Sequence, residues 1–504
     1  MMDSKNRLFF QPRWILWLIV FLGIVLGLGI RFYDLTDPPF DFQATRQLRS
    51  AIIARGMYYA DLDEAPEWQR ERALAVMEAE ALIEPPILER LSVWGYHLTG
   101  GEHLWIPRLL SALFWVSAGI AVLLLGRELG TFDGGVIALF YLLFLPYSIY
   151  ASRAFQPDPL MVASIAWAVW ASARWYRLRT MNSALLAGLL AGLSLYIKTV
   201  AVFFVGSALV GLVLFGLGLR KALRDRQVWT LGTLAVLPMI AFYIHGMWID
   251  GYLQQQFAYR FFPDLLRDPA FYIRWQEMAT NICGFGTLLA ALVGLLLLKD
   301  KGKRGLLAGM WLGYAAYSMT FAYHTLTHDY YQLPLIFIIA ASLTVLASEI
   351  LGRIAEVERG IWVRIVVMIV LLVGASFKAW DVRVNLARDD YRGDAAFWQE
   401  LGEWISPDSD VLSMSQAYGQ ALYFFGWVPN DPWLSQGDIN MRVLAGTPEE
   451  KVVQAQYDMI PKYDYFVITK VGEFHADARL SELMYNNYTV VVENDSYIIF
   501  DLRK

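Results

Sequence analysis

Long apolar runs recur along this chain, and they constrain its fold more than any other feature. Each run is close to the ~20 residues that an α-helix needs to cross ~30 Å of hydrocarbon. The chain is 57% hydrophobic and only 18% charged, which is far from the composition of a soluble globular domain. We therefore predict an α-helical polytopic membrane protein with about 11 transmembrane helices. The predicted spans are 14–30, 108–126, 134–150, 159–173, 183–198, 200–219, 229–247, 280–298, 305–322, 332–349 and 361–378.

Lysine and arginine gather in every second connection between these spans. Because cytoplasmic loops near helix ends carry such an excess, we predict a cytoplasmic amino terminus and an extracytoplasmic last segment. No small-residue cleavage site follows the first apolar run, so we expect it to remain as a helix. The positive clusters are Lys5, Arg7 and Arg13; Arg127; Arg174, Arg177 and Arg179; Arg220, Lys221, Arg224 and Arg226; Lys299, Lys301, Lys303 and Arg304; and Arg353, Arg359 and Arg364.

The remaining composition excludes some classes of protein. The net charge of −5 is small and gives no sign of a nucleic-acid partner. Cys283 is the single cysteine, so no intrachain disulfide is possible and cysteine usage does not identify the compartment.

The predicted external segments divide the chain into two domains. We predict a membrane domain over 1–378, which includes an external loop at 31–107, and a soluble extracytoplasmic α/β domain over 379–504. Within the loop, Gln43 to Tyr59 has an apolar face typical of an amphipathic helix lying on the membrane surface, and further helices are expected at 67–82 and 87–98.

The tail shows local signals of its own. Thr447 with Pro448 and Glu450 predicts a helix start with a capping box. Residues 465–469 predict a strand, and 490–493 with 497–501 predict a hairpin that turns at 494–496. The tail shows no catalytic constellation, so acceptor binding or structural support is the expected role.

Three charged residues at the predicted external face are the main candidates for chemistry. Ionisable groups near the membrane are costly, so they tend to be paired or functional. Asp41 follows Pro38-Pro39, and Asp158 lies between Pro157 and Pro159. For both aspartates the alternative role is a helix N-cap. Lys198 ends a span, where it would either snorkel to water or contact a lipid phosphate.

A second group at this face contains His324, His328, Asp329 and Tyr330. The two histidines have i,i+4 spacing, and two histidines with a carboxylate can bind a metal. The sequence lacks a His-Glu-x-x-His pattern, and interfacial histidines are common. We therefore expect no tightly bound structural metal, while a loosely held divalent cation between acidic residues remains open.

Several short motifs together resemble the GT-C glycosyltransferases, in the branch that contains the protein O-mannosyltransferases and the aminoarabinose transferase that modifies lipid A. They occur in the family's order over roughly residues 30–335. The motifs are Pro38-Pro39-Phe40-Asp41-Phe42, Arg46, Ala51-Ile52-Ile53-Ala54-Arg55, Glu84-Pro85-Pro86, Pro107 to Leu113, Ser152-Arg153-Ala154, Pro157-Asp158, Tyr196-Ile197-Lys198 and His328 to Pro334.

The resemblance implies a polyprenyl-phosphate-linked sugar as donor and a catalytic carboxylate in the first external loop, which Asp41 matches. It also implies that Asp158 is the second acidic group and that Lys198 contacts the carrier phosphate, although the family's Lys-Gly is Lys198-Thr199 here. Arg153 and Arg260 are further candidates to bind the phosphate. Asp41 and Asp158 are candidates to hold Mg²⁺ or Mn²⁺, but no cofactor is required by the resemblance.

On these grounds we expect a glycosyltransferase of the plasma (inner) membrane. It would transfer a sugar to a hydroxyl of a lipid, glycan or protein acceptor. Its expected partners are the polyprenyl-phosphate sugar donor, this acceptor and membrane lipids. A transporter or lipid flippase would more often show repeated halves or broken helices near the midplane. A non-catalytic envelope-assembly protein is the third alternative, and it would depend on the tail rather than on Asp41.

Overall fold

The computed structural model describes residues 9–10, 12–80, 82–253, 259–356, 360–406 and 408–503. Lys5, Arg7 and Arg359 of the predicted positive clusters lie outside these residues. The chain divides into two compact units. The first contains Met1–Leu35, Ala81–Leu88 and Trp105–Arg388, and the second contains Thr36–Glu80, Glu89–Leu104 and Asp389–Lys504. In this division most of the loop between the first two predicted spans groups with the tail.

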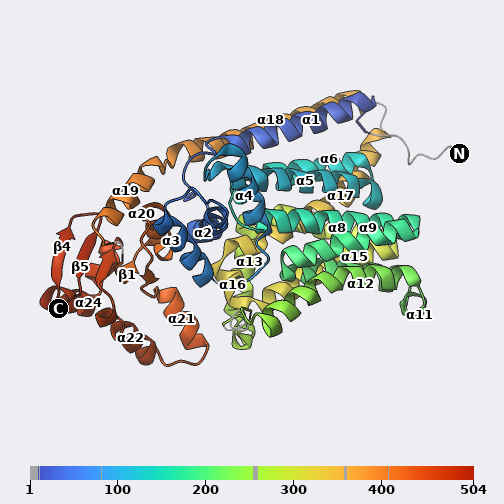
Figure 1. Ribbon diagram of the computed structural model, residues 1–504. Helices are drawn as coiled ribbons and strands as arrows, with labels where there is room; N and C mark the ends of the chain where they lie inside the picture. Colours follow the sequence, from blue (N-terminus) through green and yellow to red (C-terminus); the bar gives the residue numbers. More distant parts are fainter. Residues whose placement is uncertain are drawn as a thin grey trace. The chain divides into compact units, whose positions relative to one another are not determined.

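The first unit is a bundle of apolar helices. Figure 1 shows α1 and α18 running side by side, and the pairs α8–α9, α9–α12 and α10–α15 are also in contact. Its helices are α1 (Arg13–Phe32), α5 (Trp105–Leu129), α6 (Phe132–Phe144), α7 (Pro146–Ala151), α8 (Asp158–Leu178), α9 (Met181–Ile197), α10 (Ser207–Gly216), α11 (Leu219–Ala222), α12 (Arg226–Ile244), α13 (Pro269–Cys283), α14 (Phe285–Leu297), α15 (Lys301–Thr320), α16 (Ala322–Thr327), α17 (Leu333–Ala355) and α18 (Gly360–Arg388).

Each predicted span coincides with a helix or a helix pair of this unit. Among the described residues, 6 helices are long and apolar enough to cross a membrane, or 7 if one bent pair counts as a single span. The helices α6 and α9, which lie in the predicted spans 134–150 and 183–198, are below that length. The predicted number of spans therefore stays a prediction, while the predicted polytopic helical class is confirmed.

The bent pair corrects the prediction of one continuous span at 280–298. The helices α13 and α14 meet at 94°. Gly284 lies between them with φ of 83°, a left-handed conformation that a residue with a Cβ adopts only with strain. The helix therefore turns sharply at this glycine.

Small residues let the backbones of α10 and α15 touch. A Cβ built on Gly211 would lie 2.0 Å from the carbonyl oxygen of Gly305, and one on Gly305 would lie 2.3 Å from that of Gly211. Membrane helices commonly pack through such small residues because van der Waals contact replaces the hydrophobic drive.

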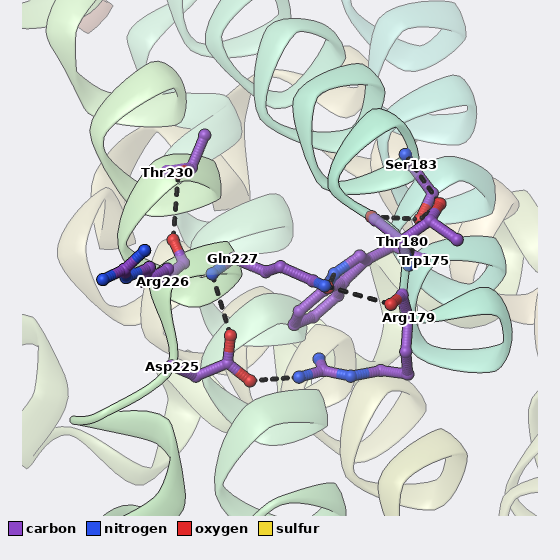
Figure 2. A network of polar contacts seen from close by, with 8 residues as sticks. All are labelled: Trp175, Arg179, Thr180, Ser183, Asp225, Arg226, Gln227 and Thr230. Atoms are coloured by element: carbon purple, nitrogen blue, oxygen red, sulfur yellow. Dashed lines mark hydrogen bonds and ion pairs between the residues drawn. The ribbon is translucent and has the colours of Figure 1, made fainter.

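A polar network joins the ends of α8, α9 and α12 (Figure 2). Arg179 forms an ion pair with Asp225, which also accepts a hydrogen bond from the backbone N–H of Gln227 and so caps α12. The Gln227 amide donates to the Arg179 carbonyl at 3.0 Å and accepts from the Trp175 indole at 2.8 Å. Thr180 and Ser183 form a capping box that starts α9. These contacts fix how three helices begin and end.

The second unit combines helices from both parts of the chain with a five-stranded sheet of order β2-β1-β3-β5-β4. Strand β1 is parallel to β2 and β3, whereas β5 is antiparallel to β3 and β4. The elements are α2 (Ala44–Ala60), α3 (Glu67–Ala79), α4 (Ile87–Thr99, whose first two residues are grouped with the first unit), α19 (Arg392–Glu403), β1 (Val411–Met414), α20 (Gln420–Gly426), β2 (Asp431–Pro432), α21 (Gln436–Leu444), α22 (Glu449–Tyr457), β3 (Tyr465–Ile468), α23 (Val471–Ala476), α24 (Ala478–Asn487), β4 (Thr489–Glu493) and β5 (Ile498–Asp501).

The predicted hairpin of the tail is present, but the predicted helix cap is not. The Asn494 side chain accepts from the backbone N–H groups of Ser496 and Tyr497 and closes the turn between β4 and β5. By contrast, Pro448 is the N-cap of α22 with a non-helical ψ of 135°, and no side chain caps this helix. The capping box predicted from Thr447 is therefore wrong, because the helix begins one residue later.

Helix α2 is not the surface helix that its sequence predicted. Its apolar residues Leu48, Ile52 and Ile53 are fully buried, but Gln47 and Arg55 are also buried, at 0% and 5% exposure. The helix contacts α3 and α20 of the same unit. Its polar residues find protein partners rather than water, so an amphipathic pattern did not reveal that the helix is enclosed.

Candidate active site

A buried ion pair between Asp158 and Lys198 is the centre of the site in the first unit. Asp158 is the first residue of α8, and its Oδ1 accepts a hydrogen bond of 2.9 Å from Lys198 Nζ. The two side chains are only 4% and 13% exposed. Pro157 occupies the N-cap position of α8, so Asp158 does not have the alternative role of a helix cap.

Lys198 is held in this position by a break in the helix. Helix α9 ends at Ile197, and Lys198 follows in an extended conformation with φ of −154°. The chain then passes through a 3-10 turn at Thr199–Ala201 and a π-helical turn at Val202–Gly206 before α10 begins. The ammonium group therefore stays inside the protein, and it does not snorkel to water.

Glu84 is the third member of this cluster. Its Oε1 lies 3.9 Å from Lys198 Nζ, which is a charge contact beyond hydrogen-bond distance. An ammonium group has three N–H donors, and the bond to Asp158 uses one of them. The two carboxylates therefore orient the lysine, and its remaining N–H groups can donate hydrogen bonds to an anionic ligand.

Asp158 also presents an oxygen that has no partner. Its Oδ2 is buried and makes no hydrogen bond to any described residue, and the same holds for both amide atoms of the buried Gln156. An unsatisfied buried acceptor costs about 1–3 kcal/mol. Such a cost persists in native proteins chiefly where a ligand, water or ion completes the site.

Two tyrosines connect this ion pair to the second predicted group. Tyr147 of α7 lies beside Asp329 and within electrostatic range of Asp158. Tyr317 of α15 is in range of Asp158 and of Tyr330, which is 6% exposed. The structure thus gathers Asp158, Asp329 and Tyr330 in one region of the first unit.

The histidines form an aromatic stack in the same group. The ring of His324 lies 5.6 Å from that of His328 and 5.7 Å from that of Tyr331, nearly parallel to both. Burial, with the charges of Arg260 and His328, lowers the pKa of His324 to about 3. His324 is therefore neutral near pH 7, and its buried Nδ1 has no hydrogen-bond partner among the described residues.

These residues do not form a metal centre of the common kind. Within the described ranges, no group of three or more His, Cys, Asp or Glu side chains is arranged to hold a metal ion. Asp41 and Asp158 belong to different compact units, so a divalent cation shared between them stays a prediction.

The two arginines predicted to bind phosphate differ in their surroundings. Arg153 is 1% exposed, and its Nη2 donates to the carbonyl of Asp34 at 2.7 Å. Arg260 is partly exposed, and its positive charge reaches His324. Arg260 is thus the more accessible cation of the pair.

Asp41 and Arg46 belong to the second unit. Asp41 is half-buried in the loop before α2, and the N-cap of α2 is Gln43 rather than Asp41. Its Oδ1 accepts from Gln47 Nε2 at 3.4 Å, while the same nitrogen donates to the carbonyl of Phe42 at 2.6 Å. Arg46 lies one turn earlier than Ser50 on α2 and is also half-buried.

Sequence reasoning missed three polar residues of these sites. Gln47 holds the loop that carries Asp41, Tyr147 lies beside Asp329, and Gln156 is fully buried next to Pro157-Asp158. Only Gln156 had a usable signal, namely an amide within a proline-rich break between two apolar runs.

The chain combines a bundle of apolar helices with a small α/β unit. It has the GT-C fold of membrane proteins. Residues 84–248 match the family model described as dolichyl-phosphate-mannose-protein mannosyltransferase. None of the curated protein sequences is a significant match to the chain.

Solved structures of the same fold cover almost the whole chain. ArnT from Cupriavidus metallidurans in the apo state has a TM-score of 0.61 at 14% identity, covering 96% of this chain and 98% of that one. The same protein bound to undecaprenyl phosphate has a TM-score of 0.59 at 14% identity, covering 98% and 99%. The apo oligosaccharyltransferase of Archaeoglobus fulgidus has a TM-score of 0.55 at 12% identity, covering 98% and 75%. These likenesses confirm the predicted GT-C resemblance at the level of fold.

Proposed function

We propose that this protein is a membrane glycosyltransferase. It transfers a sugar from a polyprenyl-phosphate-linked donor to a hydroxyl of a lipid, glycan or protein acceptor. The reaction takes place at the extracytoplasmic face of the plasma (inner) membrane. Support comes from the family model, described by a dolichyl-phosphate sugar donor, and from the fold shared with an ArnT that binds undecaprenyl phosphate.

The observation that carries the proposal is the buried pair of Lys198 and Asp158. Its ammonium retains donors for a ligand, and one carboxylate oxygen has no protein partner. A buried cation with uncommitted N–H groups suits a lipid phosphate, because charge-assisted hydrogen bonds to phosphate are strong. A transporter would place such groups near the midplane of repeated halves, whereas this pair lies where α8 begins and α9 ends.

The reaction we propose is a single displacement with inversion. The acceptor oxygen forms a bond to the anomeric carbon, the bond from that carbon to the phosphate oxygen breaks, and the acceptor proton passes to the carboxylate of Asp41. General-base assistance of this kind needs no covalent intermediate. The leaving polyprenyl phosphate gains negative charge, which Lys198, Arg153 and Arg260 would stabilise. Where a divalent cation binds Asp158, it would supply further positive charge at the phosphate.

The direct test is product formation by the purified protein. The protein is incubated with polyprenyl-phosphate sugars and candidate lipid, glycan and peptide acceptors, and the products are identified by mass spectrometry. Transfer by wild type that is lost in the folded Lys198→Met variant supports the proposal. Hydrolysis without transfer, or equal transfer by both proteins, contradicts it.

The proposed orientation has its own test. With Cys283 replaced, a cysteine at exposed Glu71 or Asp495 should react with an impermeant thiol reagent in intact cells, and one at exposed Arg224 should not. Ser50, which the sequence alone would favour for labelling, is only 3% exposed and is unsuitable. The reverse labelling pattern would place the site on the cytoplasmic side and contradict donor use at the outer face.

A further inference from the structure

A cavity of about 350 Å³ opens in the tail beyond the carboxyl ends of β1 and β3. Its lining includes Ser415, which follows β1, and Lys470, which follows β3, together with residues of α21 and α22. The strand order β2-β1-β3 makes the β1–β3 boundary a topological switch point. Parallel sheets bind ligands at the carboxyl edge of such a point, and the volume falls in the usual range of roughly 300–1,000 Å³ for small-molecule sites.

The loop after β1 is built to hold one shape at this edge. Ala417 and Tyr418 are both left-handed, with φ of 51° and 56°, although neither is glycine. Asn430 fixes the end of this loop, since its Nδ2 donates to the carbonyl of Gly419 at 3.0 Å and its Oδ1 accepts from Ser413 at 2.6 Å. The contacts keep the Tyr418 ring at the cavity.

Aromatic rings form much of the cavity wall. Trp433 packs on Phe466 of the core at 5.4 Å and on Tyr457 at 5.7 Å, which anchors it from behind. Tyr418 is 42% exposed. Aromatic faces bind the apolar C–H faces of sugar rings, because both surfaces are flat and weakly hydrated.

The charged groups of the lining already have partners within the protein. Lys470 Nζ pairs with Glu473 at 3.1 Å. The Asp477 carboxylate accepts from the Tyr457 hydroxyl at 3.2 Å and from the backbone N–H of Leu480 at 3.0 Å. With two carboxylates and one paired lysine, the cavity would repel a phosphate. Ser415 donates to the Ser413 hydroxyl at 3.4 Å, and Gln456 donates to the Leu434 carbonyl at 3.3 Å. The lone pairs of their oxygens suit an uncharged ligand with many hydroxyls.

We propose that this cavity binds a neutral saccharide unit. Its rings would stack on Trp433 and Tyr418, and its hydroxyls would bond to the polar groups around them. The binding itself is independent of the proposed transfer reaction. Its use, to hold the glycan part of an acceptor, rests on the proposed function.

The test measures saccharide binding to the full-length protein in detergent by saturation-transfer NMR. The probes are mannobiose, chitobiose and lactose, with inorganic phosphate as the anionic comparison. Tyr418→Ser should weaken binding about five- to tenfold, the loss expected for one aromatic contact. Tyr485→Ser is the matched control, because Tyr485 is 40% exposed and bonds a carboxylate as Tyr418 does, but lies outside the cavity.

The outcomes separate this proposal from the transfer reaction. Binding that is retained in Lys198→Met and weakened in Tyr418→Ser supports the cavity as a saccharide site, whether or not transfer is detected. Trp433→Leu is a second test variant, which should also weaken saccharide binding, and circular dichroism establishes that it folds. The proposal is overturned if no disaccharide gives a signal, if Tyr418→Ser and Tyr485→Ser bind equally, or if phosphate alone binds.

Discussion

Replacing Lys198 should weaken binding of the carrier phosphate more than any other single change in the first unit. In the protein, its Nζ is 2.9 Å from Asp158 and its side chain is 13% exposed, so a ligand phosphate would meet a largely desolvated cation. A hydrogen bond to a charged group contributes about 1.5–3 kcal/mol. Since 1.4 kcal/mol corresponds to a factor of ten, Lys198→Met should raise the Kd for undecaprenyl phosphate about 10- to 150-fold.

The same geometry predicts that Asp158→Asn has the opposite effect on the affinity for the carrier phosphate. The carboxylate competes with phosphate for the ammonium, so its neutral amide should strengthen carrier binding while lowering turnover. Native mass spectrometry of the purified protein with undecaprenyl phosphate measures both Kd values, and thermal melting checks folding. Lys301→Met, an exposed lysine at the start of α15, is the matched control and should bind as wild type does. An unchanged Kd in folded Lys198→Met would refute the reasoning. A gain in affinity with Mg²⁺ or Mn²⁺ that Asp158→Asn lacks would indicate a cation at Asp158.

Three further predictions concern other parts of the chain. Asp41→Asn should fold and bind carrier but lose about 10²- to 10⁴-fold in turnover, and wild-type turnover would remove Asp41 as the base. His324 has a pKa of about 3 in the folded protein and about 6.5 when unfolded, so the unfolded state gains the proton first and stability falls as the pH drops below about 6.5. The melting temperature of His324→Gln should therefore fall less between pH 7.5 and pH 5 than that of the wild type, and an equal fall would contradict this. Glu102→Gln leaves Arg55 buried without its carboxylate partner and should cost the second unit about 3–5 kcal/mol, whereas Asp61→Asn, in the exposed ion pair with Arg90 of the same unit, should cost under about 1 kcal/mol in the same denaturant titration.

The features that were predicted correctly from the sequence are those that depend on local patterns. The apolar runs identified the helices of the first unit, and the turn at Asn494 gave the hairpin because the side chain itself closes it. The helices predicted at 67–82 and 87–98 are present as α3 and α4, although α3 already ends at Ala79. In each case the signal and the structure lie within a few residues of each other.

The features that the sequence did not predict depend on contacts between residues that are far apart in the chain. From its local sequence, Lys198 would either snorkel to water or contact a lipid phosphate. Its partner Asp158 lies 40 residues earlier in the chain, and their contact requires the start of α8 and the end of α9 to meet. Arg55 lies in a segment predicted to be a surface helix, yet the groups that bury it lie at Glu102 and in the tail. No periodicity within α2 contains that information.

The pairing of Arg55 with the tail has a consequence for biogenesis. Its Nη1 donates to the carbonyl of Phe424, which follows 369 residues later, and its guanidinium lies 3.8 Å from the Phe424 ring. At about 5–20 residues per second, synthesis of that interval takes roughly 20–70 s. During this time the buried face of α2 lacks its final cover, so the early segment cannot complete its folding until the last part of the chain has been synthesised. A chain truncated before Phe424 should therefore present this face to chaperones and proteases, even though every residue of α2 is intact.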